Sequence, residues 1–238
     1  MREVLKTGLI LFVFTLTAGL ILGLVYSITS PYIGKAELNF KLTSIKDVMT
    51  DPVTGELLIS PEDLPRSLEE LEQKIYKSDD SGILYTSTKY GGRVHSPAYL
   101  FTSRDDKEIY VLEGSAIGYG GSVVCVAAFV KEPGGFRMNA LRVISYSQET
   151  PGLGAKIGEE EVMRRFYPVP PEALEKGLRV NKDAGVVPTN DSERIKYLRE
   201  HEGVIQTSDI MTGATLTPRA VVNTINTMYE FLRGEVDE

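Results

Sequence analysis

The hydrophobic pattern begins with an uncharged run from Gly8 to Ile28, GLILFVFTLTAGLILGLVYSI. A helix of about twenty residues rises 1.5 Å per residue and spans the ~30 Å hydrocarbon layer of a bilayer. The run therefore predicts a transmembrane helix, which we expect to end at Pro31. A cleaved signal peptide is the alternative, although its apolar centre is usually about 7–15 residues long and ends at an A-x-A pattern.

Positive charges set the expected orientation of this helix. Arg2 and Lys6 precede the run, whereas the first positive charge after it is Lys35. Because positive residues stay in the cytoplasm, we expect a single-pass protein of the cell (inner) membrane with a cytoplasmic N-terminus and its main domain on the extracytoplasmic side. Gly19 and Gly23 form a G-x-x-x-G pair, which is either a contact with another helix or an ordinary feature of such helices.

Beyond the membrane segment the pattern changes twice. Residues 35–49 place apolar side chains on one helical face, and Ser67 with Glu70 forms a capping box that opens a short helix. Alternating β-rich runs follow between residues 83 and 147, separated by glycine pairs. We expect a membrane anchor over 1–30, a membrane-proximal helical segment over 31–80 and a folded domain over 81–238.

Helical patterns return near the C-terminus. Two short helices are expected over 159–167 and 171–178, and a longer one from Pro218 to Arg233 with Thr217 as N-cap and Gly234 as its stop. The predicted fold class is α+β: an N-terminal transmembrane helix followed by an extracytoplasmic domain with a twisted, mostly antiparallel sheet and packed helices.

Composition narrows the chemistry. The formal net charge is −7, and an acidic chain is a poor partner for nucleic acid. The single cysteine, Cys125, lies in an apolar run and is expected to be buried, so the chain has neither an internal disulfide nor a metal site. His95 and His201 are interpreted as surface residues. No G-x-G-x-x-G, Walker A or G-x-S-x-G sequence occurs, so no catalytic residue is predicted and a bound cofactor must supply any chemistry.

The segment Ser208 to Val221, SDIMTGATLTPRAV, places three threonines and a Gly-Ala pair just before a helix. A phosphate on the hydroxyl of Thr215 would lie close to the unpaired N–H groups at the start of that helix. Gly213 and Ala214 add little bulk, which leaves room for a large group to approach. On spacing alone, a simple turn leading into a capped helix explains the segment better than a special site does.

Asp209 to Thr215 read D-I-M-T-G-A-T, which resembles the flavinylation motif D-x-x-S/T-G-A-T of the FMN-binding domain family. Glu149 to Gly154 read ETPGLG and are similar to a segment of the Rnf complex G subunit and of the C subunit of the sodium-pumping NADH:quinone reductase. The turn GYGG, Gly118 to Gly121, lies upstream, where this family usually has one.

The resemblance implies covalent FMN, joined to Thr215 by a phosphoester bond. A separate flavin transferase would attach it, using FAD and a divalent metal that belongs to that enzyme. The implied cofactor-binding residues are Asp209, Thr212, Gly213, Ala214, Thr215, Thr217, Glu149, Thr150, Pro151, Gly152, Leu153, Gly154, Gly120 and Gly121. Lys156 is either a group that favours an anionic reduced flavin or an exposed lysine.

The function that the resemblance implies is electron transfer within a membrane-bound, ion-translocating ferredoxin:NAD oxidoreductase (Rnf) complex. The expected partners are the other membrane and peripheral subunits, the flavin transferase and membrane lipid. The alternatives are the C subunit of the sodium-pumping reductase and a non-redox scaffold domain. The chain departs from the family in having ISYSQ where a histidine-containing stretch usually precedes ETPGLG, and residues 52–76 look longer than expected.

Overall fold

The computed structural model describes residues 1–236 and divides the chain into two units, Met1–Leu42 and the residues from Thr43 onward. The first unit belongs to one long helix, α1 (Arg2–Val48), which is long and apolar enough to cross a membrane. Its large apolar side chains from Leu9 to Ile28 are at least half exposed. A helix that is apolar on all sides is typical of a membrane span.

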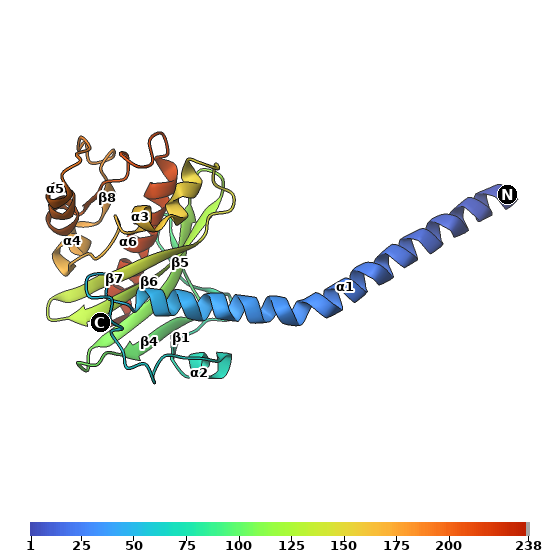
Figure 1. Ribbon diagram of the computed structural model, residues 1–238, viewed down its shortest axis with the longest axis horizontal. Helices are drawn as coiled ribbons and strands as arrows, with labels where there is room; N and C mark the ends of the chain where they lie inside the picture. The colour runs from blue at the N-terminus through green and yellow to red at the C-terminus, as the bar shows by residue number, and fades with distance from the viewer. Residues whose placement is uncertain (237–238) are drawn as a thin grey trace. The chain divides into compact units, whose positions relative to one another are not determined.

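Among the described residues, seven strands of the second unit form one antiparallel sheet (Figure 1). The strands are β1 (Ile75–Lys77), β2 (Ile83–Thr86), β3 (Arg93–His95), β4 (Ala98–Thr102), β5 (Glu108–Ile117), β6 (Ser122–Glu132) and β7 (Gly135–Ser145). β6 pairs with β5 over most of its length, so β4 and β3 share the other edge of β5, while β7 extends the sheet beyond β6. The prediction of an α+β fold with a mostly antiparallel sheet is confirmed.

The helices and the remaining strands lie before and after this sheet in the chain. They are α2 (Leu68–Glu72), the 3-10 turn η1 (Gly154–Gly158), α3 (Glu160–Met163), α4 (Pro171–Lys176), β8 (Arg179–Val180), α5 (Ser192–Tyr197), the π-helical turn η2 (Leu198–Glu202), β9 (Val204–Ile205) and α6 (Leu216–Val236). β8 and β9 pair in parallel as a second, two-stranded sheet. The Ser67 hydroxyl accepts the Glu70 N–H, as the capping box predicts.

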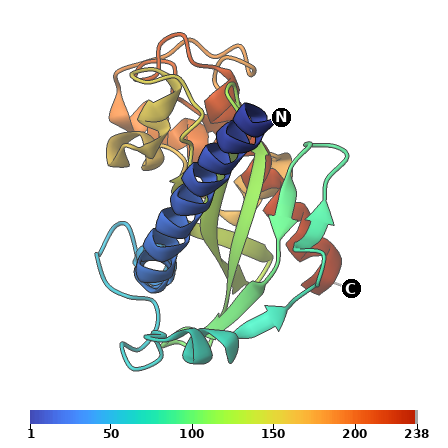
Figure 2. The same ribbon diagram turned by 90° about the vertical axis from the view of Figure 1, so that its right-hand side faces the viewer.

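The core forms where α6 packs on β3, β5 and β6 (Figures 1 and 2). Ile225, Met228 and Leu232 of α6 are fully buried in the same cluster as Leu112 and Phe129 of the sheet. Apolar side chains at this helical spacing form one continuous face. Burying that face fixes α6, and with it the loop that precedes its first turn.

The end of α1, from Thr43 onward, belongs to the second unit and packs on β7. Ile45, Val48 and Met49 are buried. The side-chain amide of Asn139 in β7 donates to the carbonyls of Val48 and Thr50 at 2.8 and 3.0 Å. The bond to Val48 satisfies a carbonyl that the helix end leaves without an intrahelical partner, and the bond to Thr50 holds the residues that follow the helix.

Several expected boundaries are wrong. Pro31 does not end the first helix but lies inside α1, because a proline removes only its own backbone hydrogen bond and the turns on either side continue the helix. Similarly, α6 begins at Leu216, so Thr217 is not its N-cap, and Gly234 is within the helix instead of stopping it. The polar stretch between α4 and the motif contains β8, α5, η2 and β9, whose short lengths leave no readable periodicity.

Candidate functional site

The loop from Thr207 to Thr215 joins β9 to α6 through two tight turns. The N–H groups of Ile210 and Met211 donate to the Thr207 carbonyl at 3.1 and 2.8 Å, and the Ala214 N–H donates to the Met211 carbonyl at 3.1 Å. Met211 is buried and anchors the loop in the core. Gly213 has φ = 91°, a left-handed conformation that favours glycine. The glycine of the motif thus has a conformational role.

Thr215 occupies the N-cap position of α6. Its carbonyl accepts the Arg219 N–H at 3.2 Å, which is the first hydrogen bond of the helix. Its hydroxyl is partly exposed, and the amino group of Lys182 lies 3.1 Å from the hydroxyl oxygen. An N-cap side chain lies beside the free N–H groups of the first helical turn, where the helix dipole favours negative charge. A phosphate attached to this hydroxyl would meet positive potential from both sources.

Glu149 connects three segments of the site from a buried position, with 4% of its surface exposed. One carboxylate oxygen accepts the N–H groups of Tyr119 and Gly120 at 2.9 and 3.2 Å. The other accepts the hydroxyl of Thr217 in the first turn of α6. This carboxylate therefore joins the β5–β6 turn to the helix that carries Thr215.

The glycines around Glu149 are required by close packing. A Cβ atom at Gly120 would overlap the carbonyl of Gln148, and one at Gly154 would clash with the Glu149 carboxylate. Gly121 closes the same turn, its carbonyl accepting the Gly118 N–H at 2.7 Å. These glycines bring the β5–β6 turn and the ETPGLG segment together, which builds one wall of the site.

A pocket of about 430 Å³, called the Thr215 pocket below, lies between these segments. Its lining residues are Tyr119, Glu149, Thr150, Leu153, Gly154, Gly213, Ala214, Thr215, Leu216 and Thr217. Eight of the fourteen residues expected to hold the cofactor therefore lie around one cavity: Glu149, Thr150, Leu153, Gly154, Gly213, Ala214, Thr215 and Thr217.

The other six expected residues do not line this pocket. Gly120 and Gly121 form the turn behind Glu149, and Pro151 and Gly152 lie in the turn between the pocket-lining residues Thr150 and Leu153. The Thr212 hydroxyl donates to the Ser208 carbonyl at 3.2 Å. Asp209 forms an ion pair with Arg165 at 3.0 Å. These six residues therefore support the loops around the pocket and do not face into it.

Sequence reasoning missed four residues at the site: Tyr119, Leu216, Lys182 and Arg219. Tyr119 lines the pocket with 72% of its surface exposed, and Leu153 and Leu216, which line the same pocket, are also exposed. Arg219 could have been found, since it follows Thr215 by four residues, one helical turn. Lys182 comes from the segment after β8, and no spacing in the sequence connects it to Thr215.

Two cations belong to this part of the molecule: Arg219 in the first turn of α6 and Lys182, whose amino group contacts the Thr215 hydroxyl. Arg219 forms a two-pronged ion pair with Asp183, with nitrogen–oxygen distances of 2.6 and 2.7 Å. The hydrogen bond from Arg219 holds the pKa of Asp183 below its ordinary value, and the same bond raises the pKa of Arg219. Because Asp183 balances Arg219, Lys182 is the cation in direct contact with the Thr215 hydroxyl.

The remaining candidate side chains, Cys125, His95 and Lys156, contact other parts of the chain and do not line the Thr215 pocket. Cys125 is fully buried, as predicted, and burial raises the pKa of its thiol. His95 was interpreted as a surface residue, but it is half-buried in the sheet, where its ring lies 3.0 Å from Glu113 and 2.8 Å from Ser115. The amino group of Lys156 lies 3.5 Å from the Ile210 carbonyl, which supports the motif loop.

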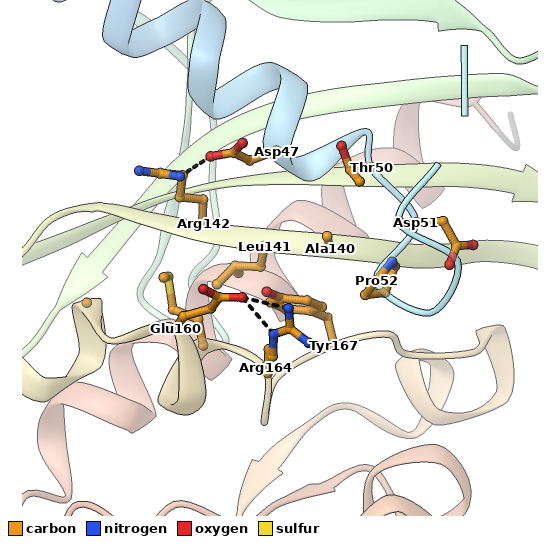
Figure 3. Close-up of a pocket in the computed structure, with 13 residues that line it drawn as sticks. Asp47, Thr50, Asp51, Pro52, Ala140, Leu141, Arg142, Glu160, Arg164 and Tyr167 are labelled. Atoms are coloured by element: carbon orange, nitrogen blue, oxygen red, sulfur yellow. Dashed lines mark hydrogen bonds and ion pairs between the residues drawn. The ribbon is translucent and has the colours of Figure 1, made fainter. Parts of the chain in front are cut away.

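A second pocket, about 560 Å³, lies between the end of α1, β7 and α3 (Figure 3). We call it the Asp47 pocket. Figure 3 shows two ion pairs at this pocket, Asp47 with Arg142 from β7 and Glu160 with Arg164. The carboxylate of Asp51, which also lines the pocket, accepts the N–H groups of Val53 and Thr54. None of the motif residues lines it. Its volume is larger than that of the Thr215 pocket, but its charged side chains already have hydrogen-bond or ion-pair partners within the chain.

Comparison with known proteins assigns the class. Residues 118–230, which include the GYGG turn, ETPGLG and the D-I-M-T-G-A-T motif, match the family described as the FMN-binding domain. The G subunit of the ion-translocating oxidoreductase complex of Shewanella piezotolerans is 26% identical over 231 residues, which cover 96% of this chain and 90% of that protein.

A solved structure agrees with this assignment. The crystal structure assigned as an RnfG subunit of an electron transport complex from Thermotoga maritima is 38% identical and has a TM-score of 0.62. The match covers 83% of this chain and 98% of that one. The chain belongs to the RnfG family.

Proposed function

We propose that this protein is an FMN-carrying electron-transfer subunit of an ion-translocating oxidoreductase complex, with FMN joined to Thr215 by a phosphoester bond. The observation that carries the proposal is the position of the Thr215 hydroxyl: it is partly exposed at the start of α6, in the wall of a pocket and 3.1 Å from the Lys182 amino group. The match of residues 118–230 to FMN-binding domains supports FMN as the group.

The residues present fit the two halves of FMN. Lys182 and the first turn of α6 supply positive charge for a phosphodiester. Tyr119, Leu153 and Leu216 supply exposed apolar surface at the same pocket, suited to a flat aromatic ring system. Glu149 is fully engaged by two backbone N–H groups and a hydroxyl, so it holds the pocket's shape.

Attachment is a phosphoryl transfer from FAD, catalysed by a separate flavin transferase that uses a divalent metal. The Thr215 hydroxyl oxygen forms a bond to the phosphorus of the FMN half. The bond from that phosphorus to the oxygen shared with AMP breaks, AMP leaves, and the hydroxyl proton is released. Lys182 remains beside the oxygen and faces the single negative charge of the diester.

The flavin, once bound, supplies reversible electron transfer. The chain holds it covalently, which keeps a cofactor in place without relying on affinity. We propose that electrons enter and leave the flavin through other subunits of the complex, since the relatives of this chain are subunits of such complexes. We propose ferredoxin and NAD as the terminal partners of that complex, acting through those subunits.

The membrane location follows from α1. We propose that residues 1–30 anchor the chain in the cell membrane, in contact with lipid and with helices of other subunits. Arg2 and Lys6 before the apolar run support a cytoplasmic N-terminus, with the domain that carries Thr215 on the extracytoplasmic side.

The test is an intact-mass measurement on the full chain co-expressed with a flavin transferase. The wild type should gain the mass of FMN less one water, and Thr215→Ala should gain nothing. Thr212→Ala, which alters the neighbouring threonine of the motif, serves as the matched control and should still carry the group. An unmodified wild type would instead favour a scaffold domain without flavin.

A further inference from the structure

The aspartate that opens the D-I-M-T-G-A-T motif points into the protein. Asp209 and Arg165 form an ion pair with a nitrogen–oxygen distance of 3.0 Å, and their side chains are only 15% and 19% exposed. An exposed pair of this kind contributes little, but a buried one is sensitive to the loss of either partner, because the charge that remains is left uncompensated. The negative charge of Asp209 therefore depends on Arg165 for compensation.

Arg165 comes from a turn that is anchored in the core by its neighbour. It lies just after α3, its N–H donates to the Val162 carbonyl at 3.1 Å, and its neighbour Phe166 is fully buried. Its partner, Asp209, lies in the first turn of the motif loop, next to Ile210 and the buried Met211. The ion pair thus ties the loop that carries Thr215 to the segment that follows ETPGLG.

The two side chains have no spare partners within the described residues. The second carboxylate oxygen of Asp209 and one terminal nitrogen of Arg165 are both buried and accept or donate no hydrogen bond. The nearby guanidinium of Arg199 contacts Glu200 at 3.0 Å and the Arg164 carbonyl at 3.3 Å, while its Nε is buried without a hydrogen-bond partner. Arg165 is the cation that forms an ion pair with Asp209.

We propose that Arg165 is a positioning residue for flavin attachment: it holds Asp209 inward, so that the aspartate of the motif shapes the loop presenting Thr215 instead of being contacted by the flavin transferase. The inference rests on the proposed attachment at Thr215. It extends the site to a residue 44 positions upstream of the motif.

The experiment measures the initial rate of FMN incorporation into the full chain, purified in detergent without flavin, by a purified transferase supplied with FAD. The variants are Asp209→Asn, Arg165→Gln and the double variant. Arg164→Gln is the matched control, because this neighbouring arginine is 61% exposed and forms its ion pair with Glu160, one helical turn away.

The full chain is the acceptor of FMN in this assay. When the acceptor is saturating, we expect FMN incorporation into each single variant and into the double variant to be slower by the same factor, about tenfold, since the two side chains act as one unit. Arg164→Gln should match the wild type. Arg165→Lys, which keeps the charge, should recover part of the rate lost in Arg165→Gln. A change in the maximal rate with little change in the KM for the acceptor distinguishes a misplaced loop from lost recognition.

A wild-type rate for Arg165→Gln beside a slow Asp209→Asn would overturn the proposal, because the transferase would then read the carboxylate itself. A double variant whose loss of rate equals the product of the two single losses would also overturn the proposal, because the two side chains would then act independently. If Arg165→Gln does not stay folded at the assay temperature, Arg165→Lys replaces it: a wild-type rate contradicts the proposal and a reduced rate supports it. Failure of the wild type to incorporate FMN would count against attachment at Thr215 instead.

Discussion

The Thr215 pocket and the Asp47 pocket differ in which of their polar groups are still available. The larger Asp47 pocket is lined by two ion pairs and by Asp51, whose carboxylate is taken up by backbone N–H groups. In the smaller Thr215 pocket the one buried carboxylate, Glu149, is used up in holding the walls, while the Thr215 hydroxyl remains partly exposed beside Lys182. Availability of a reactive group, and not cavity volume, distinguishes the candidate site.

The largest effect should come from removing the carboxylate that holds the Thr215 pocket together. Glu149→Ala leaves two backbone N–H groups and the Thr217 hydroxyl without their acceptor, which costs about 3 kcal/mol. For a chain of this size that corresponds to a fall of roughly 6–12 °C in the Tm of the full chain in detergent. Glu161→Ala, an exposed glutamate, is the control. An unchanged Tm for Glu149→Ala would show that Glu149 is not structural.

A smaller loss should follow from adding one methyl group behind the same pocket. In Gly120→Ala the new Cβ overlaps the Gln148 carbonyl, so the β5–β6 turn must move away from the ETPGLG segment, at a cost of about 2 kcal/mol. Gly234→Ala in α6 meets no atoms and should leave the Tm unchanged or slightly raised. Equal Tm values for the two variants would contradict the close-packing account.

At the Asp47 pocket the corresponding change should matter little. Asp47→Asn removes the ion pair with Arg142, in which the Asp47 and Arg142 side chains are 40% and 34% exposed, and should cost less than about 1 kcal/mol. Flavin incorporation should equal that of the wild type. A large loss of incorporation would place the flavin-attachment machinery at the Asp47 pocket and would reverse the comparison.

The smallest effect concerns the Asp183–Arg219 pair near Thr215. Because Arg219 lowers the pKa of Asp183 in the folded protein, the stability from this pair is complete above the ordinary value of 3.8 and is lost as the pH falls through the lowered pKa. Asp183→Asn should lower the Tm near neutral pH by an amount that reflects a few tenths of a kcal/mol.

That gap in Tm between the wild type and Asp183→Asn should close in acid. The exposed Asp63→Asn variant, measured over the same pH range, corrects for general effects of charge. A gap that widens below the ordinary pKa would mean that the pair is not formed in the folded protein.

The sheet was predictable because its strands are long and apolar. β5, β6 and β7 have ten or eleven residues each, enough for their pattern to be read, and the face of α6 shows a helical period. β1, β3, β8 and β9 have only two or three residues, which carry no readable period. Those strands are specified by what they pair with in space.

The site was predictable only where its residues lie close together along the chain. The motif and ETPGLG are continuous segments, and the structure brings most of their residues around one cavity. Helix boundaries were less accurate: the Thr217 hydroxyl is held by Glu149, 68 residues away, so α6 starts earlier than the N-cap pattern suggested. Lys182 and Arg165 reach the motif through tertiary folding, which spacing along the chain does not record.

The most direct test of the central claim is to locate the flavin within the chain. Trypsin cleavage after Arg199 and Arg219 releases a peptide of residues 200–219, which also contains Thr207, Thr212 and Thr217. Fragmentation of this peptide from flavin-loaded protein should place the FMN phosphate on Thr215 alone. Finding it on Thr212 or Thr217, or finding the peptide unmodified in protein that carries covalent flavin, would contradict the account.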